Sequence, residues 1–477
     1  MFFSLPRITI AALRGGSGKT MLSLGLVAAW RSLGRRTAPF KKGPDFIDAG
    51  WLTFASGRSC HNLDPFMMNK KQMLQSFFSH SNHADLSLIE GNRGLFDGLD
   101  VEGRFCTAEL AKFLESPVLL ILDVTMTTRT VAAIIMGCKT FDPALVLAGV
   151  VLNRVAGSRQ ETLIRKSIKK YCGIPVVGSI PKLDEDTFPE RHMGLIPYQE
   201  ISRAEEAVSW ARKTVQENLE LDEIWEIAVK AESIEQKFNY IQPGSEALAF
   251  HDPLRIGFIR DSAFSFYYPE NLEQLRQRGA TLIELNAVSD NELPELDALY
   301  IGGGFPETQA RELALNLDFK TSLKKEIEKG LPVYAECGGF MYLGESLLVD
   351  GKTYPMTGAL PVRFNLEKRP LGHGYTVLEV NRTNPYYKVG DTLKGHEFHY
   401  SKAIFTGRED VNFVFKIKRG FGVDGKRDGI CKKNVLATYT HLHAAGEPRW
   451  AEGLIRTAME YKKTGNLSQV SGSTLQL

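Results

Sequence analysis

One short segment, residues 333–339 with the sequence VYAECGG, constrains the fold of this chain more than any other. Residues 331–334 predict a short buried strand, and the two glycines then allow the backbone to turn sharply into a helix. A cysteine at such a turn stands clear of its surroundings, and the helix N-terminus is expected to favour its thiolate. A lone cysteine in an apolar segment is usually an inert core residue, so a nucleophile at Cys337 needs support from elsewhere in the sequence.

Two further segments supply what a cysteine nucleophile needs. A glycine run within residues 301–307 offers free N–H groups for an oxyanion hole. A strand over residues 437–443 ends in His441 and His443, and histidine is the usual partner of a nucleophilic cysteine. The two histidines lie on the same strand face, so alternation does not choose between them. The candidate oxyanion donors are the backbone N–H groups of Gly303, Gly304 and Gly338.

The N-terminal half opens with a strand over residues 8–13, a glycine-rich loop over 14–20 and an apolar helix from Met21. These are the requirements of a phosphate cradle, in which Lys19 neutralises phosphate charge and the Thr20 hydroxyl ligates Mg²⁺. The strict consensus G-x-x-x-x-G-K has glycine six positions before the lysine, where this chain has Leu13 followed by Arg14, so the loop is a deviant form. The loop residues predicted to bind ATP are Gly15, Gly16, Ser17, Gly18, Lys19 and Thr20.

Acidic residues follow two later strands of the same half. The segment KKGPDFID at 41–48 follows a strand over 37–40, and Glu90 ends a strand over 86–90. Open parallel sheets bind ligands at the carboxyl ends of their strands, and a hard cation that bridges phosphates prefers oxygen ligands. A solvated turn is the commoner fate of such a charged cluster taken alone. The predicted Mg²⁺ ligands are Thr20, Asp45 and Glu90.

Strand patterns divide the chain into two α/β parts. The first alternates strands with helices and predicts a parallel sheet covered on both faces; its strands lie near 8–13, 37–40, 86–90, 118–123, 147–152 and 176–180. The second continues into a β-rich return through residues 360–440. Its first strands lie near 255–260, 280–284, 297–301 and 331–335.

Composition excludes several classes of protein. At 477 residues the chain is too long for one core, and its net charge of +2 gives no support to a nucleic-acid or anionic-membrane partner. No apolar run approaches the roughly 20 residues of a membrane span. The six cysteines include no CxxC pair, which indicates reduced thiols. The first six residues are too short for a secretion signal. We therefore expect a cytoplasmic protein.

The motifs, taken together, resemble one known family. Segments 302–307, 335–339 and 439–443 are similar to the class I glutamine amidotransferase domain of the cobyrinic acid a,c-diamide synthase family. The similarity continues through 260–271 and back to 41–48, so it covers roughly residues 5–460 with the motifs in order. It implies an ATP-binding amidoligase domain of the dethiobiotin-synthetase-like P-loop type over 1–240. It also implies a flavodoxin-like glutamine amidotransferase domain over 250–460. The polar composition of residues 461–477 separately predicts a mobile tail.

The resemblance also implies a mechanism. Cys337 forms a thioester with glutamine, with His441, rather than His443, as base and then acid. The released ammonia passes to the N-terminal domain, where ATP and Mg²⁺ activate a substrate carboxylate by phosphorylation. Other class I amidotransferases carry an acidic residue two positions after the histidine, where this chain has His443. The third triad member therefore stays open, and Glu397 is only a speculative candidate.

Further roles follow from the resemblance alone. It implies that Lys41 contacts ATP, that Asp48 and Asp97 position the substrate, and that a motif at 191–195 lies beside the active site. Asn153 lies near the adenine in the family, where an amide can pair with the base edge. A strand-end cap is an equal alternative for Asn153.

The identity of the substrate stays open at this point. The family amidates acetate side chains of tetrapyrroles, and cobyrinate at positions a and c, in cobalamin biosynthesis, leads the candidates. Sirohaem, hydrogenobyrinate and nickel-sirohydrochlorin are alternatives. A remote alternative is a partitioning-type ATPase switch, but such proteins carry a lysine at the Arg14 position and have no glutaminase domain. We expect glutamine and a tetrapyrrole carboxylate as partners, and the resemblance leaves room for a homodimer.

Overall fold

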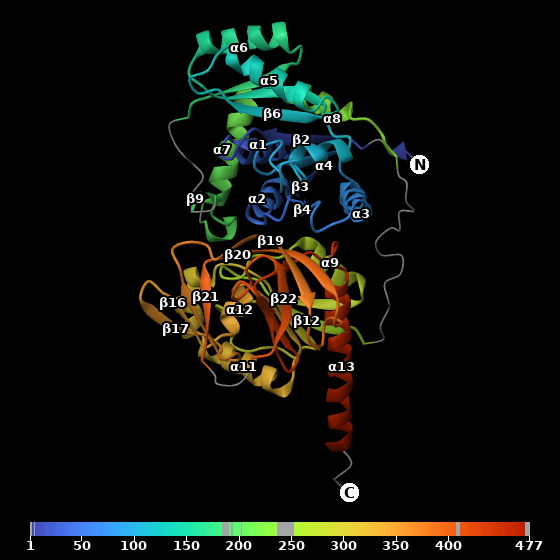
Figure 1. Cartoon of the computed structure of the whole chain (residues 1–477), viewed down its shortest axis with the longest axis vertical. Helices are drawn as coiled ribbons and strands as arrows, with labels where there is room; N and C mark the ends of the chain where they lie inside the picture. Colours follow the sequence, from blue (N-terminus) through green and yellow to red (C-terminus); the bar gives the residue numbers. More distant parts are fainter. Residues whose placement is uncertain are drawn as a thin grey trace. The chain divides into compact units, whose positions relative to one another are not determined.

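A computed structural model describes residues 2–3, 5–183, 190–191, 194–201, 203–235, 252–406 and 411–472 (Figure 1). The chain divides into two compact units, Met1–Gln242 and Pro243–Leu477. Among the described residues, none of the helices combines the length and the apolar character that crossing a membrane requires.

The first unit is built on a parallel sheet with the strand order β4-β3-β5-β2-β6-β7-β8. Each neighbouring pair runs parallel, so the carboxyl ends of all these strands share one edge. The strands are β2 (Arg7–Ala12), β3 (Thr37–Lys42), β4 (His61–Leu63), β5 (Leu86–Glu90), β6 (Val118–Asp123), β7 (Leu147–Val155) and β8 (Val176–Pro181). The predicted parallel sheet is confirmed.

Helices cover both faces of this sheet. One core packs Ile8 and Ile10 of β2 against four helices: α1 (Lys19–Ser32), α2 (Ile47–Ser56), α7 (Ala204–Asn218) and α8 (Leu221–Val229). A second core packs Ala11 on the opposite face against α4 (Thr107–Phe113), α5 (Thr130–Phe141) and α6 (Ser158–Tyr171). The period-2 alternation along β2 thus assigns successive residues to different cores. Helix α3 (Lys70–Ser81) begins with a capping box at Asn69.

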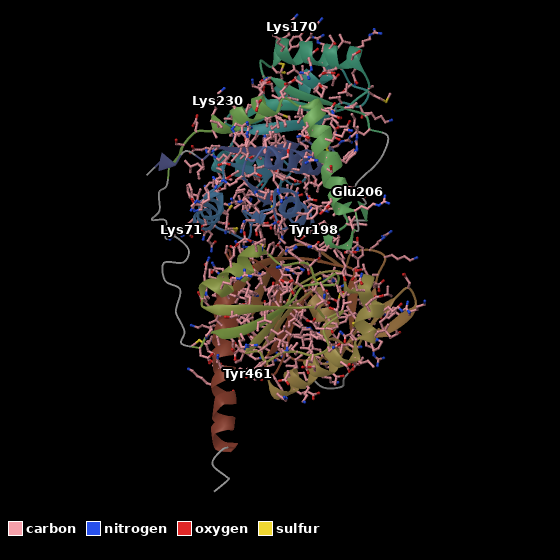
Figure 2. All side chains as sticks on the ribbon, turned by 180° about the vertical axis from the view of Figure 1, so that it is seen from behind. Lys71, Lys170, Tyr198, Glu206, Lys230 and Tyr461 are labelled. Carbon is pink, nitrogen blue, oxygen red and sulfur yellow. The ribbon has the colours of Figure 1, made fainter. Side chains whose placement is uncertain are left out.

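Helix α6 illustrates how the covering helices are held. Its buried residues, Ile164 and Ile168, are four positions apart and form one apolar stripe. Lys170 on the same helix is exposed, as is Glu206 on α7, and both side chains extend away from the ribbon in Figure 2. Burial of one stripe therefore fixes each helix on the sheet while its charged face stays in solvent.

The second unit contains a mixed sheet with the order β13-β12-β14-β15-β24-β23-β22-β19-β20-β25. Its parallel half consists of β12 (Leu254–Ile259), β13 (Ala280–Leu285), β14 (Ala298–Ile301), β15 (Val333–Glu336) and β24 (Val435–Thr438). Its antiparallel half consists of β19 (Gly372–Val380), β20 (Thr392–His399), β22 (Phe413–Arg419), β23 (Arg427–Lys432) and β25 (His441–Leu442). The predicted α/β start and β-rich return are both confirmed.

Smaller elements complete this unit. A second sheet has the order β17-β16-β18-β21, with β16 (Ser346–Val349), β17 (Lys352–Pro355), β18 (Val362–Leu366) and β21 (Ser401–Phe405). The helices are α9 (Pro269–Gln277), α10 (Ala310–Leu315), α11 (Leu317–Lys329), α12 (Gly338–Leu343) and α13 (Arg449–Gly472). The predicted tail at 461–477 overlaps the end of α13, residues 473–477 lie outside the described residues, and the tail stays a prediction.

Candidate active sites

Cys337 lies at a sharp turn between β15 and α12. Its backbone adopts φ 47° and ψ −99°, a left-handed conformation that costs a non-glycine residue on the order of 1–3 kcal/mol. The Cys337 N–H donates to the carbonyl of Thr438 at the end of the neighbouring parallel strand, at 2.8 Å. The surrounding sheet thus holds a strained conformation that presents the thiol at the carboxyl edge, as the sequence predicts for a nucleophile.

The protonation of Cys337 differs from our expectation. The sequence led us to expect that the helix N-terminus would favour the thiolate, but α12 is only six residues long and Cys337 is 6% exposed. Burial, followed by the nearby carboxylate of Glu307, raises the pKa of the Cys337 thiol, and the Gly338 N–H opposes this rise only in part. The resting residue is therefore a thiol that needs a base to remove its proton.

The glycine run at 302–304 packs directly against this turn. A Cβ on Gly303 would lie 2.5 Å from Cε1 of His441, so no side chain fits between the loop and the histidine. A Cβ on Gly338 would lie 3.1 Å from the backbone nitrogen of Gly304. The loop, the cysteine turn and the histidine strand are thus neighbours, although the oxyanion role of the three glycines stays a prediction.

His441 faces a carboxylate that the sequence did not lead us to expect. Its Nδ1 lies 3.4 Å from Oε2 of Glu336, the residue that directly precedes the nucleophile. The other carboxylate oxygen of Glu336 accepts from the N–H of Leu442 at 3.2 Å, and the Tyr300 hydroxyl donates to Oε2 at 2.9 Å. An acid at the end of a buried strand, beside a predicted nucleophile, was the signal that could have identified Glu336.

Burial disfavours the charged form of each member of this pair. It raises the pKa of Glu336 to about 8, against the opposing hydrogen bonds from Leu442 and Tyr300. It also lowers the pKa of His441 to about 3, assisted by His399. The separation of 3.4 Å is within the range of an ion pair, and the donors Tyr300 and Leu442 favour the carboxylate form of Glu336 against burial. The contact is therefore strongest when His441 takes up a proton, because the imidazolium favours the carboxylate form of Glu336.

His443, which stands at the position of the usual acid, and Glu397, the candidate named from the sequence, have different partners. Nε2 of His443 lies 3.4 Å from Oε1 of Glu270, so a second buried histidine–glutamate pair exists in this unit. The Glu397 carboxylate accepts from the N–H groups of Phe421 and Gly422 and lies 3.6 Å from His399. Glu397 is thus engaged with a different histidine from the predicted base.

In the first unit, the glycine loop lies between β2 and α1, where the sequence predicts a phosphate cradle. Gly18, at φ 96°, precedes α1, and a Cβ there would lie 2.6 Å from Nδ2 of Asn153. Asn153, near the end of β7, donates from Nδ2 to the carbonyl of Ser17 at 2.9 Å and so stabilises the conformation of the loop. Nζ of Lys19 donates to the carbonyls of Arg93 and Arg14, at 2.8 and 3.3 Å. The predicted adenine contact of Asn153 is untested by this geometry.

The predicted acidic residues gather around one buried lysine. Nζ of Lys41 lies 2.6 Å from Oδ2 of Asp48, 2.8 Å from Oε1 of Glu90 and 3.9 Å from Oδ2 of Asp45. The Thr20 hydroxyl donates to Glu90 at 2.9 Å and lies 3.4 Å from Asp48. Asp48, which we assigned to substrate, therefore lies as close to this cluster as the metal candidates do. Both assignments remain predictions.

Charge within this cluster is unevenly distributed. Burial alone would lower the pKa of Lys41, but Asp48, Glu90 and Asp45 together hold it well above its usual range. Burial and repulsion from Asp48 raise the pKa of Asp45 to about 7. Burial would also raise the pKa of Asp48, but attraction and hydrogen bonding from Lys41, with Asp45 and Lys19, together lower it. At neutral pH the cluster therefore contains a fixed Lys41–Asp48 ion pair, and Asp45 is the group poised to gain or lose a proton.

The structure also places the remaining predicted residues. Oδ2 of Asp97 accepts from the N–H of Gly94 at 2.9 Å and closes a turn in the loop that follows β5, so its substrate role is untested. His192 and Met193, in the middle of the motif at 191–195, lie outside the described residues.

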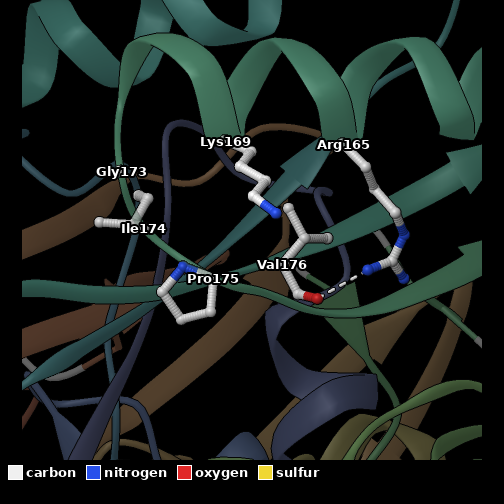
Figure 3. Close-up of a pocket in the computed structure, with 6 residues that line it drawn as sticks. All are labelled: Arg165, Lys169, Gly173, Ile174, Pro175 and Val176. Carbon is white, nitrogen blue, oxygen red and sulfur yellow. Dashed lines mark hydrogen bonds between the residues drawn. The ribbon is translucent and has the colours of Figure 1, made fainter.

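A surface pocket of about 490 Å³ lies elsewhere in the first unit (Figure 3). It is lined by Arg165 and Lys169 of α6 and by residues 173–176, where β8 begins. Nζ of Lys169 and the guanidinium of Arg165 point toward this opening, and Arg165 donates to the Val176 carbonyl at 2.7 Å. The pocket thus lies at the amino edge of the sheet, opposite the carboxyl edge that holds the lysine–carboxylate cluster.

Two family models match the chain, one in each unit. Residues 8–196 match the family model described as the CobQ/CobB/MinD/ParA nucleotide binding domain. Residues 255–449 match the CobB/CobQ-like glutamine amidotransferase domain. The first match includes the glycine loop and the lysine–carboxylate cluster, and the second includes Cys337 and His441.

Similarity to curated relatives extends over nearly the whole chain. The cobyrinate a,c-diamide synthase of Magnetococcus marinus is 41% identical over 470 residues, which are 98% of this chain and 100% of the relative. The enzyme of the same name from Archaeoglobus fulgidus is 39% identical, over 96% of this chain and 98% of the relative. That of Listeria innocua is 38% identical, over 93% and 97%. The chain belongs to the cobyrinate a,c-diamide synthase family of glutamine-hydrolysing amidoligases.

Proposed function

We propose that this protein converts the a and c acetate carboxylates of cobyrinate into amides, with ATP and glutamine as co-substrates, in cobalamin biosynthesis. Full-length similarity to three enzymes of that name supports the proposal. The observation that carries it is the presence, in one chain, of a glycine loop between a strand and a helix and of a cysteine turn with a buried histidine. An amidoligase that makes its own ammonia requires both.

The second unit supplies the ammonia. His441 takes the proton of Cys337 as the sulfur attacks the side-chain carbonyl carbon of glutamine, and the resulting oxyanion is held by the N–H groups of Gly303, Gly304 and Gly338. Collapse of this intermediate expels ammonia with the proton from His441 and leaves a thioester on Cys337. Water, activated by the same histidine, then releases glutamate and restores the thiol.

The first unit prepares the carboxylate. A carboxylate anion repels nucleophiles and has no workable leaving group, so the γ-phosphate of ATP is transferred to it first. The loop residues 15–20 cradle the phosphates, and Lys19 leaves its two carbonyl partners to neutralise them. Lys41 contacts the nucleotide, Asn153 lies near the adenine, and Asp48 and Asp97 position the macrocycle. Ammonia then displaces phosphate and forms the amide.

The residues present fit a Mg²⁺ ion. The predicted ligands Thr20, Asp45 and Glu90 offer only oxygen donors, which a hard cation prefers. Oε2 of Glu90 is buried and has no hydrogen-bond partner within the described part of the chain, so one carboxylate oxygen is available to a ligand. When bound, Mg²⁺ neutralises charge on the phosphates.

We expect Glu90→Gln to raise the Mg²⁺ concentration that gives half-maximal amidation by about tenfold or more, because one anionic oxygen is lost at constant size. The measurement is a Mg²⁺ titration at saturating ATP. Glu161→Gln is the matched control, since Glu161 lies on α6 and pairs with Arg165, away from the cluster. An unchanged Mg²⁺ requirement in a folded Glu90→Gln protein would contradict the metal assignment.

The substrate is tested directly with purified protein. Cobyrinate, hydrogenobyrinate, sirohaem and nickel-sirohydrochlorin are each incubated with ATP and glutamine, and the products are analysed by mass spectrometry. We expect two successive amidations of cobyrinate, each dependent on ATP. Preferential amidation of a sirohaem-type macrocycle would overturn the substrate assignment and keep the reaction class.

Two properties of the protein are also part of the proposal. A homodimer is supported by apolar side chains on α5 that are exposed to solvent, among them Ile134, Met136 and Phe141, and a solution mass of 53.2 kDa instead of twice that value would contradict it. A cytoplasmic location is supported by free thiols at all six cysteines, which lie within the described residues. Recovery of the protein outside the cytoplasm in cell fractionation would contradict this location.

A further inference from the structure

Glu336 lies in a buried hydrogen-bond chain that joins several elements of the second unit. Asn271 of α9 donates from Nδ2 to the Leu442 carbonyl at 2.9 Å and to the Tyr300 hydroxyl at 3.3 Å. The Tyr300 hydroxyl then donates to Oε2 of Glu336, and the Leu442 N–H donates to Oε1. Asn271 and Glu336 are at most 1% exposed. The carboxylate is thus fixed in orientation by neighbours other than the histidine it faces.

We propose that Glu336 is the positioning residue of the glutaminase: it accepts a hydrogen bond from Nδ1–H of His441 and so keeps Nε2 as the proton acceptor. This inference rests on the proposed glutamine hydrolysis. A neutral imidazole carries one N–H, and an acceptor at Nδ1 selects the tautomer with the proton on that nitrogen. The lone pair on Nε2 is then available to the proton of Cys337.

The same contact assists the chemical step. When the Cys337 sulfur bonds to the glutamine carbonyl carbon, the thiol proton moves to Nε2 of His441, and the ring becomes a cation. A carboxylate 3.4 Å from Nδ1 then stabilises that cation in a pocket with little water. The proton later leaves with ammonia, so His441 returns to the neutral form. Glu336 itself neither bonds to glutamine nor accepts the transferred proton.

A carboxylate from Glu336 also explains why this chain can have His443, instead of an acid, two positions after His441. In class I amidotransferases with an acid two positions after the histidine, the carboxylate comes from the histidine's own segment. In this chain that position faces Glu270 at 3.4 Å, and the carboxylate for His441 comes from β15, the strand of the nucleophile. Nucleophile and positioning acid are therefore adjacent in sequence.

Glu336→Gln tests the proposal at nearly constant volume. The oxygen of the new amide accepts from the Leu442 N–H, so its NH₂ group faces Nδ1 of His441. An NH₂ group donates, and it therefore selects the tautomer with the proton on Nε2, which cannot accept the proton of Cys337. We expect kcat for glutamine hydrolysis to fall by about 10³–10⁴, with KM for glutamine little changed and ammonia-dependent amidation retained. Nitrogen-15 NMR should show the His441 proton moving from Nδ1 to Nε2. Unchanged kcat in the folded variant, or a loss of kcat without the tautomer change, would overturn the proposal.

Glu270→Gln is the matched control, because it makes the same change in the other buried histidine–glutamate pair. It should leave the His441 tautomer and kcat near the wild-type values, and the reverse pattern would make His443 the base. Tyr300→Phe removes one donor to Glu336 and should lower kcat by about tenfold, so it decides the question if Glu336→Gln does not fold. Unchanged kcat in Tyr300→Phe would then overturn the proposal. Glutamate release is independent of the macrocycle, so an error in the proposed substrate changes only the amidation assays.

Discussion

Cys337→Ala should end glutamine-dependent amidation and leave ammonia-dependent amidation intact. Covalent catalysis and the oxyanion hole together contribute several powers of ten to the rate, so the residual glutamine rate should be below a few per cent of wild type. Ammonium salts at raised pH should restore the product, because only neutral ammonia is nucleophilic and its fraction grows with pH. The measurement is amide formation with each nitrogen source under otherwise identical conditions.

Cys431→Ala is the matched control for this experiment. Cys431 is another free cysteine of the second unit, on β23, and its Sγ donates to the Lys433 carbonyl at 3.7 Å. Its replacement should leave both activities near wild type. Full glutamine-dependent activity in Cys337→Ala would refute the nucleophile. Loss of both activities in a folded Cys337→Ala protein would instead assign the cysteine to the carboxylate chemistry.

The strand pattern and the glycine turns of the sequence correctly predicted most of the fold. Alternation along residues 8–12 and the apolar runs of the later strands correctly predicted the parallel sheet, because burial on both faces leaves a clear signature. Strand β4 escaped prediction since its three residues, His61–Leu63, are too few and too polar to form a pattern. The cysteine turn was predictable because a short apolar strand followed by a cysteine and two glycines is typical of a strained strand-to-helix turn.

The charges at the sites were harder to predict. The helix N-terminus at Cys337 suggested a thiolate, but the depth of the pocket outweighs a helix of six residues, and depth is a tertiary property. Glu336 was overlooked because its contact with His441 joins residues 105 positions apart. Asp48 and Asp45 could not be ranked from their spacing, since the direction of Lys41 decides which carboxylate it pairs with.

The lysine–carboxylate cluster and the glutaminase pocket differ in how burial affects their charged groups. The carboxylate cluster keeps a lysine in its centre, so Lys41 and Asp48 stay ionised while burial is offset by attraction. The glutaminase pocket contains no such fixed cation among its described residues, and Glu336, His441 and Cys337 all shift toward their neutral forms. A phosphate site must bind a polyanion, whereas a glutaminase must create charge only during the reaction. The difference in resting charge follows from that difference in task.

Lys19→Ala should abolish amidation with either nitrogen source while basal glutamate release remains measurable. Lys19 serves phosphate binding and belongs to a different unit from Cys337. Lys19 is a fixed positive charge that stabilises the negative charge developing on the phosphate during transfer. Its loss should lower the rate of phosphoryl transfer by about 10²–10³, and weaker binding of ATP adds to this loss. The measurements are amide formation with glutamine, amide formation with ammonium and glutamate release without macrocycle. Lys169→Ala, in the pocket at the opposite edge of the sheet, is the matched control.

The unfolding temperature of Lys19→Ala distinguishes loss of phosphate binding from loss of the fold. Burial and repulsion from Lys41 lower the pKa of Lys19, which means that the ammonium is held at an energetic cost in the resting protein. Removal of a desolvated cation beside a like charge relieves part of that cost, although two hydrogen bonds to backbone carbonyls are lost with it. We therefore expect Lys19→Ala to unfold at a temperature close to that of wild type. Near-normal amidation in this variant would refute the phosphate cradle, and a strongly lowered unfolding temperature would show that Lys19 holds the loop together.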